Sequence, residues 1–275
     1  LTIRIRVNGD LVVHKVLDPG YHRPMVTRLK LVSGMDIAEK RLPQDGKYHY
    51  EKGEVSTDLR ISTLPTIYGE KVVLRLLGNN RDLAFMDLYR LGMEKEQAAV
   101  FEKMLSAPYG MILVTGPTGS GKTTTLYAAL SRMAVKKINV VTVEDPVEKM
   151  IEGVTQVQVN PKAGLTFART LRSILRQDPD VIMVGEMRDE ETASIGVRAA
   201  ITGHLVLSTL HTNDCASVID RLRNMGIPPY MIADSLTGVV AQRLVKVLCP
   251  FCRKQVPWDC SQRELAHLSG IQEPE

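Results

Sequence analysis

Aromatic side chains are scarce in this sequence, which holds one tryptophan and 5% Phe, Trp and Tyr together among 275 residues. Proteins that bind single-stranded nucleic acid without sequence preference stack bases on aromatic rings, so this scarcity disfavours that class. The formal net charge of +4 is mild and adds little support for nucleic-acid binding. The composition therefore directs attention away from nucleic acid as a partner.

Long apolar runs are missing as well, because no stretch approaches the roughly 20 residues of a membrane-spanning helix, and no signal peptide is visible. There are four cysteines, two of them in Cys249-Pro250-Phe251-Cys252, which indicate a reducing compartment and a metal site more than a disulfide framework. The hydrophobic content of 44% and charged content of 24% are typical of a soluble globular protein. Since a strand pattern starts at Thr2, we expect the sequence to be a fragment of a longer protein.

A glycine-rich turn lies between the apolar run 111–114 and a helical pattern over 124–130. It matches the Walker A phosphate loop, G-x-x-x-x-G-K-[ST], in the strand–turn–helix context that supports the match. Backbone N–H groups in such a loop converge on phosphate oxygens, Lys122 would reach the β- and γ-phosphates, and Thr123 would hold Mg²⁺. The predicted ATP-binding residues are Gly116, Pro117, Thr118, Gly119, Ser120, Gly121, Lys122, Thr123 and Thr124.

Acidic residues follow two further apolar strand patterns. The run 138–143 leads into Glu144-Asp145-Pro146-Val147-Glu148, and the run 181–184 leads into Glu186. Ligands of open parallel sheets bind at the carboxyl ends of the strands. Glu186 resembles the carboxylate of a Walker B segment, which would polarise the attacking water and help to hold Mg²⁺. The first acidic cluster is also consistent with a solvated turn.

Histidines bound a further apolar run at residues 205–210. His211 follows its carboxyl end, where phosphates are expected, and would sense the γ-phosphate by hydrogen bonding. His204 precedes the run and would be structural or lie at a subunit boundary. Taken alone, either histidine is also consistent with a purely structural role.

Arginines are candidates in two places. Arg60 and Arg75 each lie in an apolar strand pattern of the first ninety residues, and either is solvated or reaches ATP from a second domain. Arg172 and Arg176 are four residues apart in a helix expected over 166–177 and would share one face. That face is either solvated or functional.

The order of the patterns predicts two domains. Residues 1–80 are expected to form an α+β module with an antiparallel sheet, 81–92 a linker, and 93–275 a doubly wound α/β domain. Helical stretches are expected near its end, one of them over 237–243. In the segment 249–275, Cys249 and Cys252 would form half of a zinc site, and Cys260 and His267 follow at loose spacing.

Five segments together resemble the secretion ATPases of type II secretion and type IV pilus assembly, namely 41–46, 116–125, 143–148, 171–186 and 202–213. The resemblance covers nearly the whole chain. It implies a RecA-like P-loop ATPase domain that works as a homo-hexamer, with a smaller PAS-like domain before it. It also implies that the C-terminal cysteines are the first half of a tetracysteine zinc motif, whose second pair is absent here. That motif favours the secretion and pilus-extension branch over the retraction branch.

The resemblance also implies roles for individual residues. Arg60 and Arg75 would close onto the phosphates, and Arg172 and Arg176 would act in the active site or in the ring contact. Glu144 and Glu148 would lie near the metal and the attacking water, and Glu186 would be the catalytic carboxylate. Lys122 and His211 complete the expected catalytic set.

The function implied by the resemblance is an ATP-hydrolysing motor on the cytoplasmic side of the inner membrane. It would power assembly of a type IV pilus or a secretion pseudopilus through an inner-membrane platform protein, with ATP and Mg²⁺ as cofactors and Zn²⁺ as a further candidate. The alternatives are a pilus-retraction motor, a DNA translocase on the same core, and a scaffold that binds ATP without turnover. Weak charge disfavours the translocase, and the intact Lys122 and Glu186 disfavour the scaffold.

Overall fold

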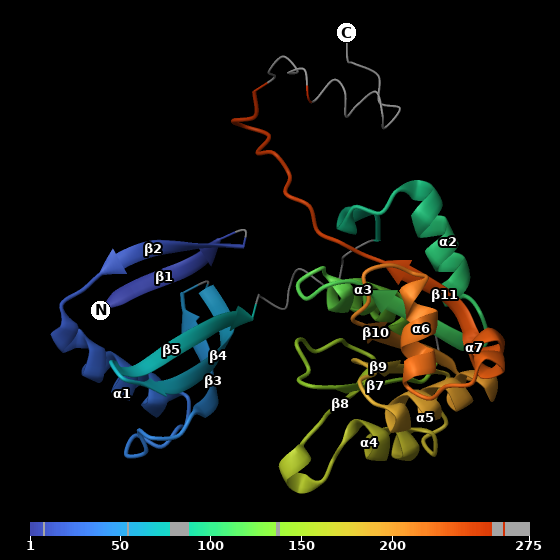
Figure 1. The fold of residues 1–275 in the computed structure, drawn as a ribbon, viewed down its shortest axis with the longest axis horizontal. Coiled ribbons are helices and arrows are strands. Elements are labelled where there is room, and N and C mark those ends of the chain that lie inside the picture. The colour runs from blue at the N-terminus through green and yellow to red at the C-terminus, as the bar shows by residue number, and fades with distance from the viewer. Residues whose placement is uncertain (8, 54, 78–87, 136–137, 255–260, 262–275) are drawn as a thin grey trace. The chain divides into compact units, whose positions relative to one another are not determined.

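The computed structural model in Figure 1 describes residues 1–7, 9–53, 55–77, 88–135, 138–254 and 261. The chain divides into two compact units, residues 1–244 and 245–275. Most of the expected linker 81–92 lies outside the described residues, which resume with the 3-10 helix η2 (Leu88–Leu91). Within the described residues, no helix is both long and apolar enough to cross a membrane.

In the described part of residues 1–77, two antiparallel sheets accompany one α-helix. A hairpin pairs two strands, and three further strands form a sheet in the order β3-β4-β5. Leu59 and Ile61 of the central strand are buried against Met35. The elements are β1 (Thr2–Val7), β2 (Asp10–Val16), η1 (Pro19–Tyr21), α1 (His22–Val32), β3 (Gln44–Lys52), β4 (Val55–Thr66) and β5 (Gly69–Leu77).

The rest of the first unit is built on a six-stranded sheet with the strand order β11-β6-β10-β9-β7-β8. Every pairing in it is parallel, so all of its strands end at the same edge. The inner strands are buried along their whole length, which agrees with their continuous apolar runs. The strands are β6 (Gly110–Thr115), β7 (Val140–Glu144), β8 (Thr155–Gln158), β9 (Val181–Val184), β10 (Leu205–Leu210) and β11 (Leu236–Ala241).

Helices cover both faces of this sheet, and a hydrophobic core lies under each layer (Figure 1). Residues of α2 and α3 pack into one core, and residues of α4, α5, α6 and α7 pack into the other. This arrangement confirms the predicted α/β class with a parallel sheet. The helices are α2 (Lys95–Leu105), α3 (Lys122–Ala134), α4 (Phe167–Ile174), α5 (Glu190–Ile201), α6 (Ser217–Asn224) and α7 (Pro229–Ser235), and the short η3 (Pro161–Ala163) precedes α4.

Two expected helices differ from the structure. The helix expected over 166–177 ends at Ile174, so Arg176 lies beyond it. The helix expected over 237–243 is wrong, because residues 236–241 form β11 and pair in parallel with β6. Val239 and Val240 are β-branched residues that suit a sheet, and the open flank of β6 supplies their backbone partners.

Candidate functional site

The predicted site residues of the α/β domain meet at the carboxyl edge of the parallel sheet. The phosphate loop follows β6, Glu144 ends β7, Glu186 follows β9, and His211 follows β10. Together they line a cavity of about 480 Å³. Its lining also includes the following members of the predicted set: Thr118, Gly119, Lys122, Thr123 and Glu148. Segments that are far apart in the sequence therefore form one site.

Two glycines of the loop have backbone conformations that other residues rarely adopt. Gly116 has φ +147° and Gly121 has φ +87°. A Cβ on Gly116 would lie 2.2 Å from the backbone oxygen of Gln242, and a Cβ on Gly121 would lie 2.8 Å from the Gln242 side-chain nitrogen. Backbone conformation thus favours glycine at both positions, and at Gly116 the close approach of the Gln242 backbone excludes a side chain as well.

The loop also carries groups that fit a phosphate. The Ser120 hydroxyl is buried without a hydrogen-bond partner, which is costly unless a ligand supplies one. The first turn of α3 has neither a side-chain cap nor an acidic residue, so its N–H groups and partial positive charge face an anion site. These features suit the phosphates of a nucleotide.

Lys122 is folded back onto its own loop. Its Nζ donates to the backbone oxygens of Gly116 and Pro117 at 2.8 and 3.0 Å. Burial lowers the pKa of Lys122, and the negative charge of Glu186 opposes that shift. An incoming phosphate would replace neutral carbonyl acceptors by charged ones, which form stronger hydrogen bonds with an ammonium group.

Glu186 lies between two other side chains of the cavity. One carboxylate oxygen forms an ion pair with Arg188, and the other lies 3.7 Å from Nε2 of His211. Burial and the positive charge of Lys122 lower the pKa of His211, so its neutral form is favoured. Arg188 is absent from the residues chosen by sequence, although its place two residues after the Walker B carboxylate was a usable signal.

The two glutamates of the acidic cluster differ in their surroundings. Glu144 is buried with 3% exposure, and its carboxylate accepts hydrogen bonds from Tyr127, Thr142 and Gln156. Glu148 is exposed and lines the cavity. Since Glu144 already has three protein donors, Glu148 is the member with more freedom to meet a ligand.

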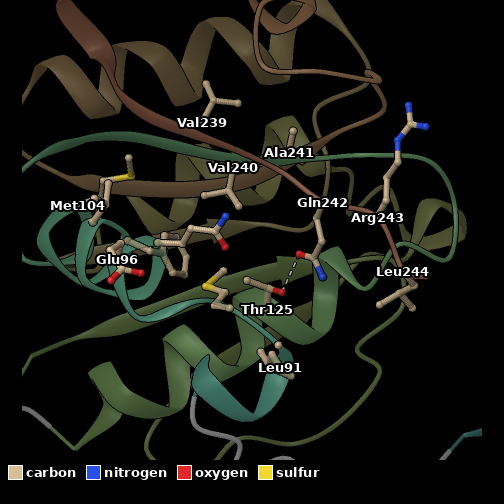
Figure 2. A pocket seen from close by; sticks show the side chains of 15 residues that line it. Leu91, Glu96, Met104, Thr125, Val239, Val240, Ala241, Gln242, Arg243 and Leu244 are labelled. Carbon is tan, nitrogen blue, oxygen red and sulfur yellow. Dashed lines mark hydrogen bonds between the residues drawn. The ribbon is translucent and has the colours of Figure 1, made fainter. Parts of the chain in front are cut away.

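A second cavity, of about 530 Å³, is lined by Thr125 of α3 and by residues of α2 and β11 (Figure 2). Apolar side chains dominate it, including Phe101 and Met104 of α2 and Val240 of β11. Thr125 of α3 donates to the amide oxygen of Gln242 at 2.7 Å, as Figure 2 shows. No sequence pattern indicates this cavity, because its walls come from three distant segments.

Arg60 and Arg75 lie on the three-stranded sheet rather than on the parallel one. They are directly opposite each other on β4 and β5, and Lys47 of β3 is opposite Arg60. Opposed strand residues share a face, so three cationic side chains form one row across the sheet. Like charges placed directly opposite are unfavourable. The row therefore suits an anionic ligand.

Arg172 and Arg176 are exposed and bind protein groups near their own helix. Arg172 donates to a carboxylate oxygen of Glu191 on α5 at 2.6 Å, and Arg176 donates to the backbone oxygen of Arg172 at 2.8 Å. Neither lines the phosphate cavity. His204 directly precedes β10, at the opposite end of that strand from His211. Its Nδ1 lies 3.1 Å from the backbone oxygen of Ala199, which agrees with a structural role.

The cysteine motif lies in the second unit. Cys249 and Cys252 are exposed free thiols, and Cys260 and His267 lie outside the described residues. Across the described residues, no group of three or more His, Cys, Asp or Glu side chains is arranged to hold a metal ion. The two described thiols supply half of the four ligands of a structural zinc site, so they do not fit zinc by themselves.

The phosphate loop after β6, the carboxylate after β9 and the parallel sheet define a P-loop nucleotide-binding protein. The chain belongs to the Type II/IV secretion system protein family, whose model matches residues 1–273.

Relatives and solved structures agree with this family. The chain is 52% identical over 267 residues to the type II secretion system ATPase E of Vibrio cholerae, covering 96% of this chain and 52% of that protein. It is 50% identical over 257 residues to the type IV pilus assembly ATPase PilB of Thermus thermophilus, covering 94% and 29%. The structure of the pilus retraction motor PilT with bound ADP matches with a TM-score of 0.68 and 29% identity, covering 88% and 71%. The chain spans about half the length of the type II secretion relatives it matches.

Proposed function

We propose that this chain binds and hydrolyses ATP as part of a motor that powers assembly of a type IV pilus or a type II secretion pseudopilus. The observation that carries the proposal is the meeting of Lys122, Thr123 and Glu186 around one cavity at the carboxyl edge of the sheet. The relatives named as secretion and pilus ATPases support it, and their sequence identity of about half extends over nearly all of the chain. Retraction, as in the PilT motor, is the alternative on the same core.

The phosphates would bind at the start of α3, with Lys122 turning from its loop carbonyls to the β- and γ-phosphates. Mg²⁺ fits the Thr123 hydroxyl and the Glu186 carboxylate, because it needs only one or two protein ligands beside phosphate oxygens. When bound, it would neutralise charge that develops on the phosphates. Glu186 would orient the attacking water and accept its proton. His211, favoured in its neutral form, can donate one hydrogen bond to the γ-phosphate.

The base of the nucleotide would occupy the second cavity, on the far side of the helix start. That cavity is mostly apolar, and a purine has two apolar faces with polar edges. Gln242 and Gln97 provide amide groups in its lining for those edges. The two cavities would therefore hold opposite ends of one nucleotide, with the phosphate loop between them.

The row formed by Lys47, Arg60 and Arg75 would supply cations to the nucleotide phosphates when the N-terminal PAS-like domain (residues 1–80) closes on the ATPase domain (93–275). The row has the charge and the side-by-side spacing that phosphates need. Because these cations lie on a separate element, hydrolysis would depend on closure, as a motor requires.

The assembly would be a homo-hexamer on the cytoplasmic side of the inner membrane, acting on a platform protein. Arg172 and Arg176 are exposed and would serve the contact between subunits. Zinc binding through Cys249 and Cys252 stays a prediction that requires two further ligands.

The proposal is tested by phosphate release from ATP and from inorganic tripolyphosphate, with the full-length wild-type protein and Lys122→Ala. Wild-type protein is expected to hydrolyse ATP, and the variant is expected to lose nucleotide binding or turnover. Tripolyphosphate is expected to be a poor substrate, because it has no base to bind in the second cavity. Wild-type turnover by Lys122→Ala would contradict the assignment of the phosphate loop, and equal use of both substrates would contradict the base site.

A further inference from the structure

Three side-chain donors converge on the buried carboxylate of Glu144, the last residue of β7. Thr142 donates to Oε1 at 2.6 Å, Gln156 donates to Oε1 at 3.1 Å, and the Tyr127 hydroxyl donates to Oε2. A buried carboxylate is tolerated only when it is fully hydrogen-bonded. Side chains of the protein therefore supply hydrogen bonds to both carboxylate oxygens of Glu144.

Tyr127 joins this carboxylate to the acidic segment that follows it. The same hydroxyl that donates to Glu144 accepts a hydrogen bond from the backbone N–H of Glu148 at 3.1 Å. Burial, followed by the contact with Glu144, raises the pKa of Tyr127, so the phenol keeps the proton that it donates. The ring belongs to α3, the helix that begins at Lys122, and is 1% exposed. One rigid side chain thus connects the phosphate-loop helix to Glu148.

Gln156 of β8 extends the same network along the segment after Glu148. Its amide nitrogen donates to Glu144 and to the backbone oxygen of Lys149 at 2.9 Å. Its amide oxygen accepts from the backbone N–H of Ile151 at 2.7 Å. Backbone atoms of residues 148, 149 and 151 are therefore held by side chains that all meet at Glu144. Such a network has one arrangement in which every group is satisfied.

We propose that Tyr127 is a positioning residue for ATP hydrolysis, which holds Glu148 in its place on the wall of the phosphate cavity. The inference rests on the proposed function. Glu148 lines that cavity together with residues of the phosphate loop, and Tyr127 contacts its backbone rather than its carboxylate. The phenol therefore fixes the position of the Glu148 carboxylate without contacting the nucleotide. Small displacements of a positioned group slow catalysis strongly, while ground-state binding depends on the phosphate loop.

Replacement by phenylalanine isolates the hydroxyl, because the ring that fills the core remains. In full-length Tyr127→Phe, the N–H of Glu148 and one oxygen of Glu144 lose their partner. We expect kcat for ATP to fall by about 10- to 100-fold. The Kd for ADP is expected to stay within about 2-fold, since Lys122 and the loop are unchanged. The matched control is Tyr109→Phe, because Tyr109 is half-exposed and lies outside both cavities, and it is expected to keep the wild-type kcat.

A double-mutant cycle separates positioning from a general loss of stability. If Tyr127 acts through Glu148, then Tyr127→Phe added to Glu148→Gln should lower kcat little beyond Glu148→Gln alone. If the phenylalanine variant does not fold, Glu144→Gln replaces it in the same cycle, because it weakens the same network from the other side. Expected fold is checked for every variant by circular dichroism and thermal melting.

Three results would overturn the inference. They are a wild-type kcat in Tyr127→Phe, a rise in the Kd for ADP that matches the fall in kcat, and independent effects of the two substitutions in the cycle. If the full-length wild-type protein has no ATPase activity, the proposed function is overturned as well. The two failures are distinguishable, because in this case the wild-type protein and every variant are equally inactive.

Discussion

Glu186→Gln tests the hydrolytic step most directly, because it removes one charge and keeps the shape of the side chain. In the structure the carboxylate pairs with Arg188 and lies 3.7 Å from Nε2 of His211. It also lies near enough to Lys122 for its charge to oppose the lowering of that residue's pKa. The amide would keep part of this hydrogen bonding but would be a far weaker base than the carboxylate.

The effects of Glu186→Gln on catalysis and on stability should differ in size. A positioned general base contributes about 10²- to 10⁴-fold to the rate, which corresponds to about 2.7–5.5 kcal/mol of activation free energy. The ion pair is open to solvent at Arg188, which is 67% exposed, against 14% for Glu186. An ion pair of this kind contributes about 0–1 kcal/mol to the free energy of unfolding. The melting temperature should therefore fall by no more than about 4 °C.

Steady-state phosphate release should show the fall in kcat, and titration with Mg-ATP should show an unchanged or smaller Kd, since one negative charge near the phosphates is gone. Glu152→Gln is the matched control, because Glu152 is exposed and outside both cavities. A loss of Mg-ATP binding together with hydrolysis would refute the role as base and make Glu186 a metal ligand first. A fall in kcat below about 10-fold would refute both roles.

Two further substitutions test other parts of the site. Arg75→Ala should lower kcat for ATP more than it raises the Kd for ATP, since the Arg75 cation is proposed to act on closure. Equal losses in kcat and in affinity would argue against that role. Lys71→Ala on the same strand is the control. His211 has a pKa lowered from 6.5, so the folded protein takes up fewer protons than the unfolded chain as the pH falls through that value. The free energy of unfolding should therefore decrease below about pH 6.5, and His211→Gln should make that decrease smaller in urea titrations at pH 5 and pH 7; an identical pH dependence in both proteins would contradict it.

Much of the α/β domain was predictable because its signals are local. The phosphate loop is one continuous segment whose glycines are required by backbone conformation, and the structure places it after β6 as predicted. Glu186 and His211 follow continuous apolar runs, which in a parallel sheet are buried strands with a shared carboxyl edge. These facts alone predict that Lys122, Glu186 and His211 lie at one cavity.

The segment 236–241 shows where local pattern fails. Its residues are compatible with either a helix or a strand, and it becomes β11 because β6 offers an unpaired flank. This choice also brings Gln242 against Gly116 and Gly121 and forms one wall of the second cavity. These contacts join residues that are far apart in the sequence, so no local pattern indicated the second cavity.

The acidic cluster separates the two sources of information most clearly. The sequence by itself determined that carboxylates lie at the carboxyl end of β7, the edge of a parallel sheet where ligands bind. Only the tertiary structure decided that Glu144, although it lines the cavity, accepts hydrogen bonds from three side-chain donors, while Glu148 is exposed at the same cavity. The physical reason is that the cost of burying a charge depends on its partners, and Tyr127 and Gln156 reach Glu144 only after α3 and β8 have packed around β7.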